Sequence, residues 1–403
     1  MTAAGHTPIP RLRRHAGAAV LGYGFRPFFL LSGLSAAIVL AVWLAELAGI
    51  PVLDSRFSPL DWHIHEMLFG FAVAAVAGFL LTAIPNWTGR LPVQGTPLAA
   101  LALLWLAGRL AMAHSASIGG LVAAGIDLAF LAALIAAVAR EIVAGRNWRN
   151  LPMVGGLAAL LVANVLMHGE TLALIDAGGA GWRLAVAILI LLIALIGGRI
   201  VPSFTRNWLA KRPAGPMPAP FGRWDQLTLA GTLVALASWV ILPGSDTAIA
   251  ALAVAAMLNL VRLLRWQGRR TLADPLVAVL HVGWAWVPAG FALLAAAQGD
   301  QAPVTQSTAV HALTAGAVGT MILAVMTRAT LGHTGRSLTA GPATTLIYLL
   351  VTLAALARVA AGLWPGVQGL LWVSGFAWIG AFSGFVGVYG PMLLRPRIDG
   401  KPG

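Results

Sequence analysis

Histidine is the residue type in this chain best able to bind a metal. The sequence has 9 His and 13 Asp and Glu among 403 residues, and it has no Cys. Because no thiolate is available, iron–sulfur clusters, thiolate-ligated haem and cysteine-type zinc sites are excluded. A metal in this protein must therefore be held by histidine, methionine, tyrosine or a carboxylate.

Several polar residues lie inside long apolar segments. They are His63, His65, Glu66, Asp127, Asn164, His168, Glu170, His281 and His311. A charged residue at the centre of a bilayer costs at least about 2.5 kcal/mol, so ionisable residues there usually have a function. Neutral imidazoles that converge from several helices are typical ligands of haem b, copper or non-haem iron. A single intramembrane histidine is more often a packing residue, so a metal site requires several histidines at one depth.

Residues 62–66, WHIHE, place two histidines two positions apart. On a regular helix His63 and His65 point about 200° apart, so they cannot easily bind one metal and would face two different sites. His63 and Glu66, three residues apart, share a helix face, and the carboxylate would orient this imidazole. Glu66, Glu170 and Asp127 are the candidates for proton transfer.

Arginine and threonine recur together in two segments, 197–208 and 327–336. Guanidinium groups match the geometry of carboxylates, so Arg199 and Arg328 are candidates to bind haem propionates or another anion. The alternative is that these arginines only anchor helix ends at the membrane face.

Twelve apolar segments, each long enough to cross a bilayer as a helix, carry these residues. They are 27–50, 61–84, 97–113, 117–139, 151–174, 183–203, 225–243, 246–264, 275–297, 306–330, 341–363 and 368–394. The chain has 59% apolar and 10% charged residues, and this composition excludes a water-soluble domain. The apolar runs are continuous, which favours helices over a β-barrel. We expect an all-α polytopic membrane protein with a cytoplasmic segment 1–26, a twelve-helix domain 27–394 and a cytoplasmic tail 395–403.

The basic residues predict the orientation of these helices. On the side of the N-terminus the segments carry 22 Lys and Arg, against 4 on the other side, namely Arg56, Arg109, Arg183 and Arg358. Both termini are therefore expected in the cytoplasm. The net charge of +13 is a topology signal, and no nucleic-acid partner is expected.

This topology predicts the depth of the histidines. His63, His65, His168 and His311 would share a layer near the outer face, and His281 would lie deeper. Because a helix rises 1.5 Å per residue, His311 and Arg328 would be about 25 Å apart. A haem at the outer layer therefore could not reach both inner arginines with its propionates.

An internal repeat links the second and tenth segments. In both, a histidine is followed by Gly five residues later and by Thr-Gly-Arg that ends 25 residues later. The two copies start at His65 and His311, and 197–208 is a partial third copy. We expect the second and tenth helices to hold equivalent places.

The longest motifs resemble the NnrS family of bacterial membrane proteins that contain haem and copper. They are FRPFFLLSG at 25–33, WHIHEMLFGF at 62–71, GFLLTAIPNWTGR at 78–90, GGRIVPSFTRNWL at 197–209, LHVGWAW at 280–286 and the segment 311–336. The resemblance covers about the first five-sixths of the chain and implies twelve spans and a role in nitric oxide handling. Its matching positions imply the ligand candidates His63, His65, His281, His311 and His333, and His168 lies in a less similar stretch.

The function expected from these observations is a haem b protein, with copper as a further cofactor. It would bind or reduce nitric oxide in denitrification or in defence against nitrosative stress. If it is an enzyme, it would be an oxidoreductase of the nitric oxide reductase type that takes electrons from quinol or from a periplasmic donor such as a cytochrome. The alternatives are a proton-coupled transporter or metal carrier, and a non-catalytic scavenger or sensor of nitric oxide.

Overall fold

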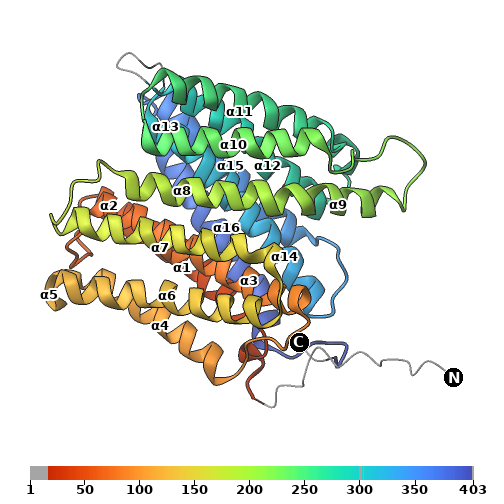
Figure 1. Ribbon diagram of the computed structural model, residues 1–403, viewed down its shortest axis with the longest axis horizontal. Helices are drawn as coiled ribbons and strands as arrows, with labels where there is room; N and C mark the ends of the chain where they lie inside the picture. Colours follow the sequence, from red (N-terminus) through yellow and green to blue (C-terminus); the bar gives the residue numbers. More distant parts are fainter. Residues whose placement is uncertain (1–16, 299–301, 303, 402–403) are drawn as a thin grey trace.

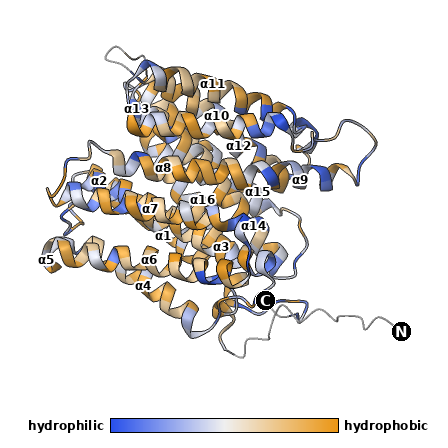
Figure 2. Ribbon diagram, in the orientation of Figure 1, coloured by the Kyte–Doolittle hydropathy of each residue, from blue (hydrophilic) through white to orange (hydrophobic). Residues whose placement is uncertain are grey.

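The computed structural model describes residues 17–298, 302 and 304–401, and within them the regular structure is helical with no strand. The predicted segment 1–26 is thus described only from residue 17 onward. Twelve helices in the described part are long and apolar enough to cross a membrane, which confirms the all-α, multi-pass prediction. They lie side by side along the longest axis (Figure 1), with apolar residues along their middle and hydrophilic residues towards their ends (Figure 2).

Nine of the twelve helices are uninterrupted. They are α1 (Phe25–Leu47), α4 (Thr96–Ala113), α6 (Gly120–Ala144), α7 (Leu151–Thr171), α10 (Arg223–Ile241), α11 (Asp246–Leu264), α12 (Pro275–Ala296), α15 (Pro342–Leu363) and α16 (Gly369–Leu394). Short helical turns connect some of them: η1 (Ala19–Leu21), α5 (Ser115–Ile118), η3 (Trp148–Asn150) and η5 (Gly268–Thr271).

The second, sixth and tenth helices each contain a π-helical segment. The second is α2 (Pro59–His65), η2 (Glu66–Ala72) and α3 (Val73–Thr88). The sixth is α8 (Ala180–Leu192), η4 (Ile193–Gly197) and α9 (Gly198–Leu209). The tenth is α13 (Gln306–His311), η6 (Ala312–Gly319) and α14 (Thr320–His333). Short π-helical segments inside α-helices often occur at functional sites.

These three helices are longer than predicted. The sequence predicts that the second helix ends at residue 84, but it passes through Pro85 and ends at Thr88. A proline near a helix end removes only one hydrogen bond, and Gly89, the next residue, has φ of 72°, the left-handed conformation that ends many helices. The sixth and tenth helices also continue beyond their predicted ends, through segments rich in Arg and Thr.

The π-containing helices form the centre of the molecule. In the second, sixth and tenth helices 78%, 56% and 67% of the span is buried, and 61% in α12, against 33–44% in the other eight. Around them α1 packs on α16, α6 on α7 and α11 on α12. Counted along the chain, the π-containing helices are the second, sixth and tenth of the twelve. Each is therefore the second helix in one of three consecutive sets of four helices.

The second and tenth helices share their local construction as well as their sequence motif. Each begins with a hydroxyl cap: Ser58 accepts a hydrogen bond from the Asp61 N–H at 3.2 Å, and Thr305 from the Thr308 N–H at 3.2 Å. In each, the π-helical segment starts directly after the histidine that opens the repeat, His65 or His311. The caps fix where each helix starts and so place its histidines within two turns of that end.

Candidate metal and cofactor sites

A buried polar cluster joins the second, third, fourth and fifth helices. Its members are His65, Glu66, Arg109, Asp127, Asn164 and His168, called the His65 cluster below. The His65 ring is fully buried, with Nδ1 3.0 Å from Glu66 Oε1 and Nε2 2.9 Å from Asn164 Oδ1. Asn164 donates its amide to Asp127 Oδ2 at 2.8 Å. Nearly every polar atom of the cluster therefore has a partner.

Arg109 connects the two carboxylates of this cluster. Its guanidinium donates to Glu66 Oε1 at 2.5 Å and forms a second ion pair with Asp127. The sequence places Arg109 among the basic residues of the side opposite the N-terminus, and in the structure its side chain lies inside the bundle, only 10% exposed. An arginine held by two buried carboxylates is a structural residue rather than an orientation signal.

The formal charges of the His65 cluster do not balance when both imidazoles are neutral. Two carboxylates and one guanidinium leave a net charge of −1 in a buried site, which is energetically costly. One further positive charge would balance it, either a proton on an imidazole or a metal cation.

The donor atoms for a metal are already close together. One atom each of His65, Asp127 and His168 lie within 4.8 Å of one another, and all three residues are buried. The Nε2 atoms of His65 and His168 lie 3.2 Å and 3.0 Å from Asp127 Oδ2. Two imidazoles and one carboxylate suit copper, zinc or iron, so this cluster could hold such an ion.

Glu66 orients a different histidine from the one predicted. The expected pair was His63 and Glu66, but the Glu66 carboxylate contacts His65, its neighbour in the chain. The same carboxylate oxygen, Oε1, also accepts a hydrogen bond from Arg109, so this ion pair holds Glu66 in the His65 cluster. His63 points to another site.

His63 lies in a cavity of about 420 Å³ together with His311. We call this the His63–His311 cavity. It is formed by the first, second, sixth, tenth, eleventh and twelfth helices, and its volume is within the range of small-molecule and cofactor pockets. Its lining includes Trp43, Leu44, His63, Phe71, Trp182, Leu189, Ser307, His311, Val318, Arg358 and Trp378. Aromatic walls with few polar groups are the surroundings that a flat apolar cofactor requires.

The two imidazoles of this cavity differ in their hydrogen bonds. His311 Nδ1 donates to the Ser307 carbonyl at 2.7 Å, which fixes the tautomer and leaves the Nε2 lone pair free for a metal. The His63 ring stacks on Trp43 with ring centroids 4.9 Å apart. Its Nδ1 is buried and has no hydrogen-bond partner among the described residues, as expected of a group whose partner is a ligand.

An arginine lies at the outer end of the same cavity. Arg358 of α15 lines it and donates to Ser307 Oγ at 2.9 Å. The predicted anion-binding arginines lie elsewhere. Arg199 lines a separate pocket with Arg149 and Arg206, and the Arg328 guanidinium lies 4.1 Å from the centre of the Phe204 ring. Neither lines the His63–His311 cavity.

A family model described as NnrS protein matches residues 19–397. The chain belongs to the NnrS family. The match extends through α15 and α16, beyond the motifs recognised in the sequence, and so includes Arg358. No curated protein sequence matches the chain. Membership of this family indicates a membrane protein of the nitric oxide response.

The remaining histidines of the NnrS motifs lie away from both sites. His281 shares a hydrogen bond of 2.8 Å with Thr205 through Nε2, and its Nδ1 is buried without a partner among the described residues. The His333 ring packs against Tyr23 and Phe25, with ring centroids 6.0 Å and 5.3 Å away. Neither of them belongs to a group of three possible metal ligands within the ranges that the structure describes.

Glu170, a candidate for proton transfer, has a structural contact. Its carboxylate accepts the Gly179 N–H at 2.8 Å across the turn between α7 and α8. It also lines a shallow hollow at that turn with residues 173–176. Of the predicted carboxylates, Glu66 and Asp127 are thus the ones that contact histidine.

Sequence reasoning missed two residues of the His63–His311 cavity. They are Trp43, and Arg358, which was counted only among the basic residues of the side opposite the N-terminus. The position of Arg358, five residues before the end of an otherwise apolar span, was an available signal. Neither could be linked to His63 from the sequence, because the contact depends on how the first and eleventh helices pack on the second and tenth.

Proposed function

We propose that this protein is a haem-containing membrane protein that binds nitric oxide in the His63–His311 cavity. The single observation that carries the proposal is the pair of imidazoles from two helices in one apolar cavity of about 420 Å³. Family membership supplies the nitric oxide context. A bacterial inner membrane with both termini in the cytoplasm, as the basic residues predict, completes the proposal.

Different residues of the His63–His311 cavity would contact different parts of a haem. His311 would hold the haem iron through Nε2, because its Nδ1 is held by a backbone carbonyl and its Nε2 is free. Arg358 would bind the propionates, since a guanidinium pairs well with carboxylates. His63 would face a diatomic ligand and donate a hydrogen bond to it. A bound haem supplies the iron to which nitric oxide coordinates and the capacity for one-electron chemistry.

The His65 cluster is proposed as a second metal site, with copper as the ion. Support comes from its donor set and from the net charge of −1, which a cation would neutralise. Electrons for any reduction would come from quinol or from a periplasmic donor.

Absorption spectra of the purified protein test the haem site. His311→Gly should remove the haem bands, and added imidazole should restore them by filling the space of the lost side chain. His114→Gly is the matched control, because His114 is exposed at the end of α4, and it should keep the wild-type spectrum. A wild-type protein without haem after expression in haem-replete cells would refute the proposal.

Absorption spectra of a His63→Ala variant test the role of His63. His63→Ala should keep the haem but release bound nitric oxide faster, because a hydrogen bond to the ligand is lost. If His63→Ala instead converts a six-coordinate low-spin spectrum to a five-coordinate one, then His63 is a second axial ligand and its assignment to the bound gas is wrong.

Metal analysis tests the His65 cluster. His168→Gln removes one donor but leaves the ion pairs of Arg109 intact, so copper content should fall by about one ion per chain while haem content stays unchanged. His281→Gln is the control, because this histidine lies outside the cluster. Equal copper in His168→Gln and wild type would show that the cluster is a proton-holding network and no metal site.

The alternative function is a transporter. If the haem spectra and the metal analysis both fail, the second, sixth and tenth helices surround a cavity with no fixed cofactor, which is the arrangement of a transporter. Proteoliposome uptake of protons or divalent metal would identify it.

A further inference from the structure

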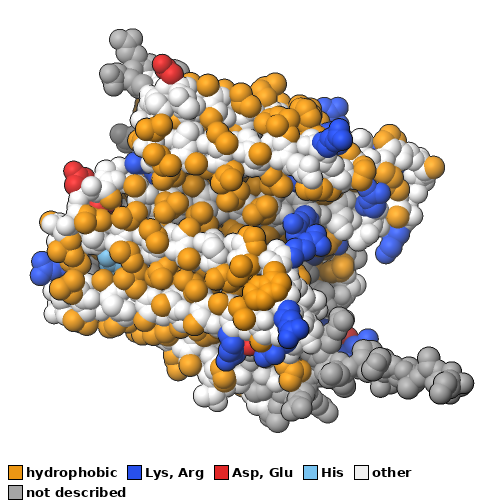
Figure 3. All heavy atoms as spheres, in the orientation of Figure 1, with side chains coloured by type: hydrophobic (Ala, Val, Ile, Leu, Met, Phe, Trp, Pro, Cys, Tyr) orange, Lys and Arg blue, Asp and Glu red, His pale blue; other side chains and the backbone are white. Residues whose placement is uncertain are grey.

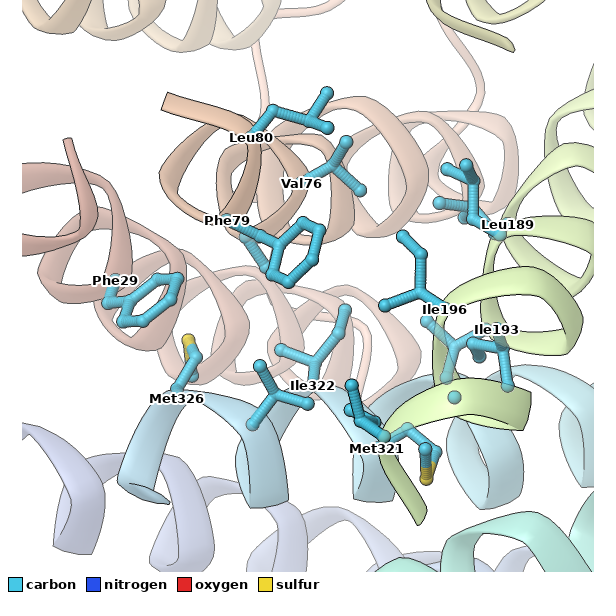
Figure 4. Close-up of a pocket in the computed structure, with 16 residues that line it drawn as sticks. Phe29, Val76, Phe79, Leu80, Leu189, Ile193, Ile196, Met321, Ile322 and Met326 are labelled. Carbon is cyan, nitrogen blue, oxygen red and sulfur yellow. The ribbon is translucent and has the colours of Figure 1, made fainter. Parts of the chain in front are cut away.

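A second hollow lies next to the His63–His311 cavity, and every side chain that lines it is apolar. We call it the apolar hollow; its volume is about 90 Å³. Phe79, Ile196 and Ile322 face one another across it, from the second, sixth and tenth helices (Figure 4). Leu189 and Ile193 lie towards one end of the view, and Phe29 and Met326 towards the other.

The two cavities are consecutive along all three central helices. On the second helix the His63–His311 cavity is lined down to Ala72, and the apolar hollow begins at Ala75. On the sixth and tenth helices they share a residue, Leu189 and Val318 respectively. The hollow thus continues the cavity from the outer half of the helices towards their middle.

The π-helical segments lie along this route. Segments η2 and η6 line the His63–His311 cavity, and η4 lines the apolar hollow. A π-helical turn is wider than an α-helical one and interrupts the regular packing of side chains. Gly197 lies in η4, and a Cβ at this position would lie 3.1 Å from Met321 Cε and 3.2 Å from the Trp284 ring. The absence of a side chain therefore lets these two residues pack closely against η4.

The chemistry of the hollow selects what can occupy it. A purely apolar cavity stays dry, because a water molecule inside would find no hydrogen-bond partners. Ions and protons are excluded for the same reason. A volume of about 90 Å³ is far below that of cofactor pockets, so the hollow holds one or two small uncharged molecules and no ring system. Diatomic gases have this size and polarity, and they concentrate in the hydrocarbon where the hollow lies.

We propose that the apolar hollow is the route by which a diatomic gas enters the His63–His311 cavity from the middle of the membrane. This inference rests on the proposed function, because it assigns the gas as the ligand of that cavity. It adds an entry path separate from the outer end of the cavity, where Asp61, Gln306 and Arg358 present polar groups to water.

Substitutions at one wall residue test the route in both directions. Ile322 lines the hollow and not the His63–His311 cavity. Ile322→Trp should slow the association of carbon monoxide with the reduced protein about tenfold, because the larger side chain narrows the route, whereas Ile322→Ala should speed it. The haem spectrum and the equilibrium affinity should stay unchanged, because the route changes and the bond does not, so the dissociation rate should change by the same factor as the association rate. Flash photolysis in nanodiscs measures both rates.

The matched control is Leu349→Trp, which adds the same side chain to a position 63% exposed on α15. It should leave the association rate unchanged. Equal rates in wild type, Ile322→Trp and Ile322→Ala, with intact spectra, would overturn the route.

Xenon binding tests the hollow without using the haem. A crystal of the wild-type protein under xenon pressure should show xenon between Phe79, Ile196 and Ile322, and the Ile322→Trp protein should show none there. An ordered acyl chain in this space would overturn the gas route. A protein that binds xenon here but contains no haem would refute the proposed function and leave the hollow as a gas site, so the two failures are distinguishable.

Discussion

At the scale of single residues, Arg109 supplies the positive charge of the guanidinium that lies between the two buried carboxylates of the His65 cluster. It pairs with Glu66 and Asp127, and each of those carboxylates also contacts a histidine. Removing one partner of a buried ion pair leaves the other charge uncompensated, which is costlier than never having the pair. The stability of the His65 cluster therefore depends on this one side chain.

We expect Arg109→Ala to destabilise the protein by about 3–5 kcal/mol, because two buried carboxylates lose their counter-ion. Thermal denaturation in detergent should show a clearly lowered midpoint. Arg56→Ala is the control, since Arg56 is exposed in the loop before α2, and it should melt like the wild type. The double change Arg109→Ala with Glu66→Gln should recover part of the loss, and no recovery would contradict the charge argument.

At the scale of elements, the π-helical segment η2 decides where the two histidines of α2 point. His65 faces the His65 cluster while His63 faces the cavity with His311. The segment lies between these histidines and the inner half of the same helix. It therefore sets the rotation of α2 relative to α3.

Deleting Met67 from η2 should convert the segment to a regular α-helix. This rotates α2 by about 100° relative to α3, the angle that one residue occupies in an α-helix. Haem and copper content should both fall while circular dichroism still shows a helical protein. Deletion of Gly366, which lies in the turn between α15 and α16 with open space around it, is the control and should keep both cofactors. Retention of both cofactors without Met67 would show that η2 does not orient the histidines.

At the scale of the whole molecule, charge is distributed unevenly between the two ends of the helices. Lys and Arg gather at the end that contains the tips of α9 and α14, and the visible lateral surface is mainly apolar (Figure 3). The positive-inside rule predicts that this basic end faces the cytoplasm. The His63–His311 cavity and the His65 cluster lie towards the opposite end.

The absence of cysteine allows a direct test of this orientation. Ser117→Cys and Ser337→Cys each introduce one thiol at an exposed position, near α5 and after α14 respectively. In intact spheroplasts a membrane-impermeant maleimide should label the first and leave the second unlabelled. Both should react after the membrane is broken. Labelling of Ser337→Cys alone in intact spheroplasts would reverse the orientation.

The architecture was predictable from the sequence because its cause is local. Each span must satisfy its own backbone hydrogen bonds in lipid, so continuous apolar runs such as 246–264 and 341–363 specify helices by themselves. The divergence of His63 and His65 was also predictable, since it follows from helix geometry alone. The link between the second and tenth helices was visible because it is written as a sequence repeat.

The composition of the two sites was decided only by the tertiary structure. The partners of His65 on other helices are Asn164 of α7 and Asp127 of α6, and Arg358 joins His311 through the packing of α15 on α13. A pattern along one chain carries no information on which faces of separate helices meet. The partner of Glu66 is the clearest case. Helical spacing predicts a contact with His63, but Arg109 of another helix holds the Glu66 carboxylate in the His65 cluster, and the spacing along one helix does not show that ion pair.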